Sequence, residues 1–541
     1  MMRIDQVDPV VAEHRQSAMQ LGLCVLIVLV LLHTALEAVW AGWYCWLPGG
    51  LSRSRDAEAV AITAVAYGKW QGYASYRAVN RTLREHGLSV QQEDLARVGA
   101  THYFDVMTDP KLLDAALKAA STLDAPAAEG MYYSQDEKGA AAFYIIAFAL
   151  FGIASASWYW LYMALYSLSV LAACVAFHRR SEVLFFLLAV VCTHELVAQL
   201  LPTIPRQDLN LIHASRFLGI MASVAMFHLM FLILQRKRPT TSEIAAAALQ
   251  TGIICLTVNA RTSAAWLLIA VMLLWAMLWL MWLFRRARTG LQAPKPTSWP
   301  MGVLALGLAG LLLHQQFGQD PAFHDSRAQG GHVFWHNIVT TLHNNPLHTG
   351  RYGIPAEFPV YDDQVSYLLF DREVARRGEE RSKYLMGDSD WVYRTSSPDL
   401  DFRWVAYDRV LRDVFVRTVA SDPWYAIYSF LAQQPRSAVT IVFGRDFLRS
   451  RALLDRAPFL ALIFGVLLIA ANIPLRPATY VPVLAFASFG VVLPVLCAAV
   501  AELRVVEMFY ILLLAAIVGV AVVAAVVGRL VLVRLRRRGT A

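Results

Sequence analysis

The sequence predicts an all-α polytopic membrane protein with about ten transmembrane helices and two large extracytoplasmic segments. The first supporting observation is composition: of 541 residues, 57% are hydrophobic and 16% are charged, and the mean hydropathy is +0.46. Soluble domains carry about 25% charged residues, so water is not the only solvent of this chain. The second is a series of apolar runs long enough to cross a hydrocarbon core about 30 Å thick. The third is the clustering of basic residues at the ends of these runs.

Ten apolar runs define the expected membrane helices. The first, near residues 20–46, is too long for the apolar core of a signal peptide and lacks a clear cleavage site, so we expect it to remain as a helix. The other nine lie near residues 156–177, 182–202, 212–235, 241–260, 263–284, 299–317, 457–474, 477–500 and 505–530.

Charges on the short loops predict the orientation. If the N-terminus is cytoplasmic, so are the segments with several basic residues, at positions 179–180, 236–238, 285–288 and 534–538. The opposite loops carry one basic residue each, at Arg206, Arg261 and Arg504. This asymmetry follows the positive-inside rule and predicts that both termini are cytoplasmic. Counting residues 140–151 as a further crossing would place positions 179–180 outside, so we expect that apolar stretch to lie along the interface.

This topology divides the chain into five parts. Residues 1–47 form the N-terminus and first membrane helix, and residues 48–155 form a first outer loop with interfacial helices. Residues 156–317 contain membrane helices 2–7, residues 318–456 form an outer domain, and residues 457–541 contain helices 8–10 and a basic cytoplasmic tail. Turn signals within 318–456 predict an ordered domain and not a linker.

Several functional classes are disfavoured by what the sequence lacks. The six cysteines lie in or at the edge of apolar runs without CxxC or Cys/His metal spacing, so we expect neither a disulfide framework nor a structural zinc site. No Walker sequence or GxGxxG fingerprint is present, which argues against a cytoplasmic ATPase. The net charge of +8 is concentrated beside apolar runs, so we expect membrane lipids and no nucleic acid as partners.

Two acidic residues, Asp56 and Glu58, follow the first apolar run. A partly desolvated carboxylate near the outer interface can take a proton from a hydroxyl and act as a general base. Asp56 could equally be a helix N-cap, with Glu58 as an acidic first-turn residue that complements the helix dipole. The pattern alone leaves both interpretations open.

A family resemblance rests on the order of short motifs. After the first apolar run come Asp56-Ala57-Glu58, a helix ending near Gly68, then DEKG at 136–139, FY at 143–144 and LFG at 150–152. Over roughly residues 20–180, this order resembles GT-C membrane glycosyltransferases, and most closely the protein mannosyltransferase and aminoarabinose transferase branch. The resemblance implies that Asp56 is the catalytic base, that Glu58 is its neighbour or a metal ligand, and that the sugar donor is a polyprenyl phosphate.

Such a reaction requires cations around the departing phosphate, because negative charge develops on its oxygens. The outer ends of the spans offer Arg206, Arg261 and Arg504, and the planar fork of arginine suits phosphate. Each could instead be a snorkelling anchor at the membrane surface.

The second outer segment contains an aromatic and histidine cluster. His332 and His336 would share one helical face at i, i+4 beside Trp335, a spacing compatible with a metal or with hydrogen bonds to an acceptor. Asp362 and Asp363 follow in the same segment. We expect this set to contribute to the acceptor site, and the alternative is interfacial packing by the aromatic residues with solvated histidines.

One polar pair, His194-Glu195, lies within an expected span. Ionisable groups inside a membrane are functional hypotheses by default. The pair could be a proton relay of a transporter, or it could line an outer cavity because it lies in the second half of its span.

These expectations combine into one functional hypothesis. The chain is expected to be an inverting glycosyltransferase of the bacterial inner membrane, which moves a sugar from a polyprenyl-phosphate donor to an acceptor hydroxyl of a glycan, lipid or protein. A polysaccharide polymerase or ligase is a neighbouring alternative, a transporter or flippase of lipid-linked sugars is the rival, and a noncatalytic scaffold is a third. A transporter predicts related halves, and the sequence shows no repeat. The sequence specifies neither the sugar nor the acceptor nor a cofactor, although a divalent cation is compatible with it.

Overall fold

The computed structural model describes fourteen parts of the chain, and every regular element within them is a helix. These parts are residues 9–40, 138–152, 156–200, 214–235, 238–289, 295–317, 334–343, 345, 347–355, 364–384, 404–437, 451–474, 477–497 and 501–539. The described chain therefore agrees with the predicted all-α class.

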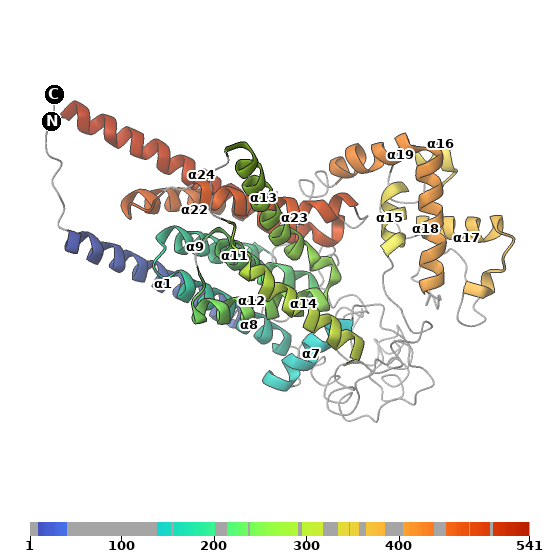
Figure 1. Ribbon diagram of the computed structural model, residues 1–541, viewed down its shortest axis with the longest axis horizontal. Coiled ribbons are helices and arrows are strands. Elements are labelled where there is room, and N and C mark those ends of the chain that lie inside the picture. Colours follow the sequence, from blue (N-terminus) through green and yellow to red (C-terminus); the bar gives the residue numbers. More distant parts are fainter. Residues whose placement is uncertain are drawn as a thin grey trace.

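Eleven helices in the described ranges form an apolar bundle (Figure 1). They are α1 (Pro9–Trp40), α7 (Lys138–Phe151), α8 (Ala156–Phe177), α9 (Ser181–Leu200), α11 (Ala214–Leu234), α12 (Thr241–Ala260), α13 (Trp266–Thr289), α14 (Trp299–Phe317), α22 (Arg451–Ala470), α23 (Pro477–Cys497) and α24 (Ala501–Gly539). Each of the ten predicted apolar runs overlaps one of them.

Six of these helices, among the described residues, contain stretches long and apolar enough to cross a membrane: α1, α8, α9, α12, α13 and α24. Shorter apolar stretches lie in α11, α14 and α23. Several long apolar helices thus indicate an integral membrane protein, while the count of ten crossings stays a prediction.

The core of the bundle lies around α9 and α11, whose middle residues are buried on all sides. Helices that are apolar all round are expected at such central positions. Phe186 of α9 packs edge-on against Phe227 and Phe231 of α11, with ring centroids 5.0 and 5.2 Å apart. On α1, by contrast, leucines such as Leu29 and Leu32 are exposed, as expected for side chains that face lipid.

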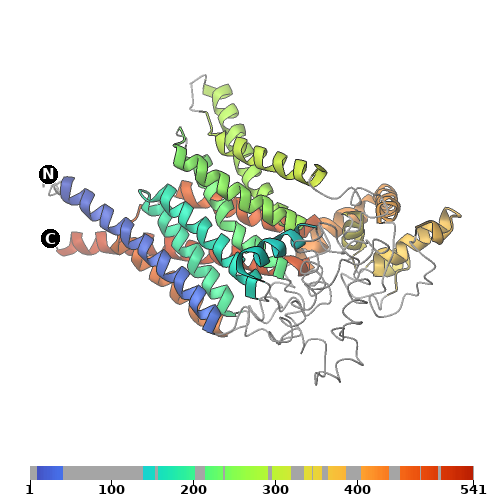
Figure 2. The same cartoon turned by 90° about the horizontal axis from the view of Figure 1, so that it is seen from below.

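Helices α1 and α9 run parallel, as do α22 and α24. His33 and Glu37 of α1 meet Glu195 and Gln199 of α9 in the same order along both helices. In α22 and α24, Gly465 lies against Ala521, and further along Arg529 donates to the carbonyl of Leu468 at 2.7 Å. The start of α1 and the end of α24 lie at one end of the bundle in both views, and α15–α19 lie at the other (Figures 1 and 2).

Helix α7 is separate from α8. It ends at Phe151, and Gly152 follows with a φ of 84°, a left-handed conformation that glycine adopts without steric cost. The hydroxyl of Ser157 in α8 donates to the Gly152 carbonyl at 2.5 Å. This break keeps residues 138–151 from continuing directly into the span that follows.

A second apolar core lies in the helices between residues 334 and 437, which the sequence predicts to be extracytoplasmic. They are α15 (Phe334–His343), α16 (His348–Tyr352), α17 (Gln364–Arg376), α18 (Trp404–Ser421) and α19 (Pro423–Tyr428), with a π-helical turn at Ser429–Gln433. Val339, Phe370 and Tyr407 are fully buried between them. Because this core is distinct from that of the bundle, we refer to residues 334–437 as the outer unit.

Candidate functional site

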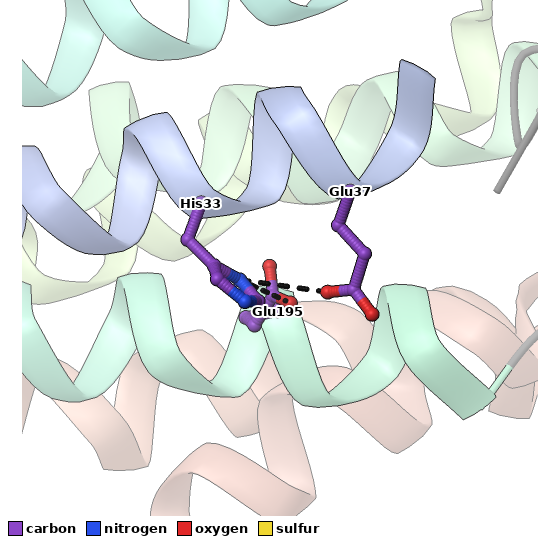
Figure 3. A group of neighbouring side chains, drawn as sticks. All are labelled: His33, Glu37 and Glu195. Carbon is purple, nitrogen blue, oxygen red and sulfur yellow. Dashed lines mark ion pairs between the residues drawn. The ribbon is translucent and has the colours of Figure 1, made fainter. Parts of the chain in front are cut away.

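A cluster of ionisable side chains between α1 and α9 is the candidate site. His33 and Glu37 share one face of α1 because they are four residues apart, and Glu195 of α9 lies opposite them (Figure 3). His33 Nδ1 is 3.4 Å from Glu37 Oε2 and 3.2 Å from Glu195 Oε1. We call these three residues the His33 cluster.

Gln199 ties the two carboxylates of the cluster together. Its Nε2 donates to Glu37 Oε2 at 3.0 Å and to Glu195 Oε1 at 2.7 Å. Its Oε1 in turn accepts from Nη1 of Arg456 in α22. Three helices therefore fix the positions of the carboxylates, which would be costly to hold charged in an apolar surrounding without such partners.

The exposure of the cluster is graded. The Glu195 side chain is 13% exposed, Glu37 is 33% exposed and His33 is 61% exposed. The carboxylate of Glu195 thus sits against the bundle, while the imidazole opens towards the surface.

A second polar group lies next to the cluster on α9. His194 Nε2 shares a hydrogen bond of 2.8 Å with the Tyr162 hydroxyl of α8, and its ring stacks on Tyr166 with centroids 4.2 Å apart. His194 is buried. It therefore points away from the His33 cluster into the bundle, and the sequence neighbours His194 and Glu195 have separate partners.

A third polar link crosses the middle of the bundle. The Ser169 hydroxyl of α8 donates to Gln250 Oε1 of α12 at 2.6 Å, and Gln250 Nε2 lies 3.0 Å from His228 Nδ1 of α11. All three side chains are buried. This link holds three helices in register.

The predicted phosphate-binding arginines are described only in part. Arg261 ends α12, where its backbone N–H donates to the Thr257 carbonyl at 2.8 Å, and its side chain is half-buried. Arg504 belongs to α24, but its side chain lies outside the described residues, as does Arg206. Asp56 and Glu58 also lie outside the described ranges, so their predicted roles stay predictions.

Of the predicted acceptor residues, Trp335 and His336 are described, in α15. His336 Nδ1 shares a hydrogen bond of 2.7 Å with the Tyr407 hydroxyl and the side chain is buried. Trp335 packs against Phe415, with ring centroids 5.3 Å apart. Both residues therefore join α15 to α18 within the outer unit. His332, Asp362 and Asp363 lie outside the described residues.

Another histidine of the outer unit is buried among tyrosines. His343 Nδ1 lies 3.2 Å from the Tyr425 hydroxyl, and its ring meets Tyr352 edge-on at 4.9 Å. Burial, together with the nearby His348, lowers the pKa of His343 to about 3. The imidazole is consequently neutral at pH 7 and serves as a packing and hydrogen-bonding group.

Comparison with known proteins gives no relative: no family model, no curated protein and no solved structure matches the chain.

The His33 cluster was missed by reasoning from sequence, which singled out Glu195 but neither residue of α1. The signal that was available is the spacing of His33 and Glu37, two ionisable residues at i, i+4 within the first apolar run.

Proposed function

We propose that the chain is an inverting membrane glycosyltransferase, which moves a sugar from a polyprenyl-phosphate donor to an acceptor hydroxyl on the extracytoplasmic face of a bacterial inner membrane. The observation that carries the proposal is the unequal use of polar side chains at the two ends of the bundle. Towards the C-terminal ends of α1 and α9, ionisable side chains of different helices pair with one another.

At the opposite end, ionisable side chains are used mainly to cap helices. Glu243 forms a capping box with Thr240 at the start of α12, and Arg529 of α24 donates to the carbonyls of Leu468 and Ile473 at the C-terminal end of α22. Such contacts satisfy groups that every helix end leaves unpaired. The bridging contacts of the His33 cluster have no such local role, which favours a binding or catalytic site at that end.

The direction of the helices supports an extracytoplasmic site. With both termini cytoplasmic, α1 and α9 run outward, so the His33 cluster lies in the outer half of the bundle. The same orientation would put the outer unit and the segment 48–139 on that side. Donor, acceptor and catalytic residues would then share the outer membrane surface.

The proposed reaction assigns a role to each predicted residue. Asp56 takes the proton of the acceptor hydroxyl while that oxygen bonds to the anomeric carbon from the face opposite the phosphate. The bond between the anomeric carbon and the phosphate oxygen breaks, and polyprenyl phosphate leaves with the electron pair, held by Arg206, Arg261 and Arg504. Glu58 adjoins the base. The acceptor site is assigned to His332, Trp335, His336, Asp362 and Asp363.

A second candidate function is transport of lipid-linked sugars. The buried contact of His194 with Tyr162 and the link from Ser169 to His228 favour it, because polar side chains within a membrane often mark transport paths. A polymerase or ligase that uses a diphosphate-linked glycan is a variant of the first proposal and would use the same outer surface.

One paired experiment separates the two classes. Purified protein in detergent is given a radiolabelled polyprenyl-phosphate sugar with candidate acceptors, and the same protein in proteoliposomes is tested for movement of that lipid-linked sugar across the bilayer. The proposal predicts labelled product and no protein-dependent movement. Movement across the bilayer without transfer to any acceptor would favour the transporter and contradict the transferase.

A further inference from the structure

We infer that His33, Glu37 and Glu195 bind one divalent transition-metal ion of the Zn²⁺ class. The three candidate ligand atoms, one imidazole nitrogen and two carboxylate oxygens, all lie within 4.8 Å of one another. Figure 3 shows the three side chains converging from α1 and α9. The inference rests on this geometry alone and goes beyond the proposed function.

The spacing of the ligand atoms fits a small tetrahedral ion. Ligands at the usual Zn–N and Zn–O distances of about 2.0–2.2 Å are separated by about 3.3–3.6 Å in a tetrahedron. The imidazole nitrogen of His33 lies 3.4 and 3.2 Å from the two carboxylate oxygens. Two of the three distances between ligand atoms therefore match the tetrahedron, and the third, between the two carboxylate oxygens, is at most 4.8 Å.

The charge of the cluster favours a divalent cation. When both glutamates bind as carboxylates and His33 binds through a neutral imidazole, the three ligands together carry two negative charges, and a divalent cation balances both. The described contact of Arg456 is with the Gln199 oxygen and not with either carboxylate. Of the two Glu195 oxygens, Oε1 is the candidate ligand atom, at 3.2 Å from His33 Nδ1.

Gln199 supplies the outer support that metal ligands need. By donating to both carboxylates it fixes their orientation, and Arg456 fixes the amide in turn. We assign Gln199 as a positioning residue and not as a ligand. Three protein ligands leave the fourth position of a tetrahedral ion for water or for an oxygen of an anionic substrate, which is the arrangement of reactive rather than structural zinc sites.

The ligand types select the ion. Imidazole nitrogen suits Zn²⁺ and its transition-metal neighbours, whereas Mg²⁺ and Ca²⁺ prefer sites made only of oxygen. We therefore expect Zn²⁺ to bind and neither Mg²⁺ nor Ca²⁺ to displace it at equal concentration.

The test measures metal binding without any transfer assay. Full-length protein purified with a tag that lacks histidine is stripped with a chelator and titrated with Zn²⁺ by calorimetry, and bound metal is counted by mass spectrometry. We expect one Zn²⁺ per chain. His33→Ala and Glu195→Gln should remove it, and Gln199→Ala should weaken binding by roughly 10–100-fold. His14→Ala, at the other end of α1, is the matched control and should bind as the wild type does.

Folding of the variants is checked by their elution from size-exclusion chromatography. If Glu195→Gln fails this check, Glu37→Gln gives the same test at a more exposed position. Two results would overturn the inference. One is a wild-type protein with no Zn²⁺ site tighter than about 100 μM. In that case hydrogen bonds between the three side chains, and not a metal ion, hold the cluster together. The other is unchanged stoichiometric binding in folded His33→Ala and Glu37→Gln variants.

Discussion

Trp266 donates its indole N–H to Glu507 Oε2 at 2.9 Å, across 241 positions of the sequence. The bond joins the first residue of α13 to the N-terminal part of α24. Glu507 is only 3% exposed, and a buried carboxylate is stable only when its oxygens are hydrogen-bonded. The bond therefore fixes where α13 meets α24, close in sequence to Arg261 and Arg504.

Gly219 of α11 makes room for this bond. A Cβ at this position would overlap the carboxylate of Glu507, so Gly219→Ala requires Glu507 to turn away from Trp266. We expect a loss of about 1–3 kcal/mol, typical of overpacking, in the unfolding of the purified protein. Gly252→Ala in α12 should cause no loss, because nothing lies within 4 Å of the new methyl group.

A double variant checks the cause of that loss. In a Glu507→Ala background the overlap is gone, so adding Gly219→Ala should cost little more. An undiminished loss in this background would show that Gly219 is constrained by something other than Glu507.

The two arginines near this bond should affect donor binding. Replacing Arg261 or Arg504 by Lys keeps the charge but removes the planar fork of donors, so affinity for a polyprenyl-phosphate sugar should fall. Loss of a hydrogen bond to a charged group corresponds to about 1.5–3 kcal/mol, or roughly 10–100-fold in affinity. Binding of a fluorescent donor analogue would measure it, with Arg285→Lys at the far end of α13 as the control. Unchanged binding in both Ala variants would remove these arginines from the site.

Sequence reasoning located the helices well and the contacts between them poorly. Helix α8 begins and ends where predicted, at residues 156 and 177, because long apolar runs identify spans directly. The partners of Glu195 could not be predicted in the same way. Gln199 and Glu37 are 162 positions apart, and only the packing of α1 on α9 brings them together. In the same way, nothing in the sequence around His336 predicted that this side chain would be buried against Tyr407.

Parallel packing of α1 and α9 makes the topology prediction sharper. If α1 and α9 both span the membrane in the same direction, the number of crossings between them is odd. Helix α8 alone supplies one crossing, so α7 can cross the membrane only if one further crossing lies between α1 and α9. We therefore expect single cysteines at Ala100 and Leu400 to react with an impermeant reagent from the outside. A cysteine at Thr289, the last residue of α13, should react only after the membrane is opened. Labelling of positions 100 and 400 from opposite sides would refute this topology.

Glu373 should stabilise the outer unit in a pH-dependent way. Burial alone would raise the pKa of Glu373, but hydrogen bonds from Arg417, Arg376 and Arg377 lower it well below the ordinary range. Because the folded pKa is depressed, the stabilisation is present above the unfolded pKa of about 4.3 and is lost as the pH falls towards the folded value. Glu373→Gln should therefore destabilise the outer unit at pH 7 and less so below about pH 4.

Hydrogen exchange of α17 and α18, corrected for intrinsic rates, measures this effect. At pH 7 we expect Glu373→Gln to lower the free energy of unfolding of the outer unit by about 1.5–3 kcal/mol. The loss stays below that of a fully buried ion pair because the arginines are partly exposed. Glu380→Gln, at an exposed position, should change little. A gap between wild type and Glu373→Gln that stays constant down to pH 2 would contradict the assigned role.

Transfer by an Asp56→Asn variant tests the proposed chemistry most directly. Asparagine keeps the shape of the side chain and its ability to cap a helix, but it cannot take the proton of the acceptor. With a radiolabelled polyprenyl-phosphate sugar, the variant should fold in the membrane and bind donor while transferring sugar about two to four orders of magnitude more slowly. Asp114→Asn in the same outer segment should transfer normally. Near-normal transfer by well-expressed Asp56→Asn would exclude Asp56 as the base and contradict the mechanism.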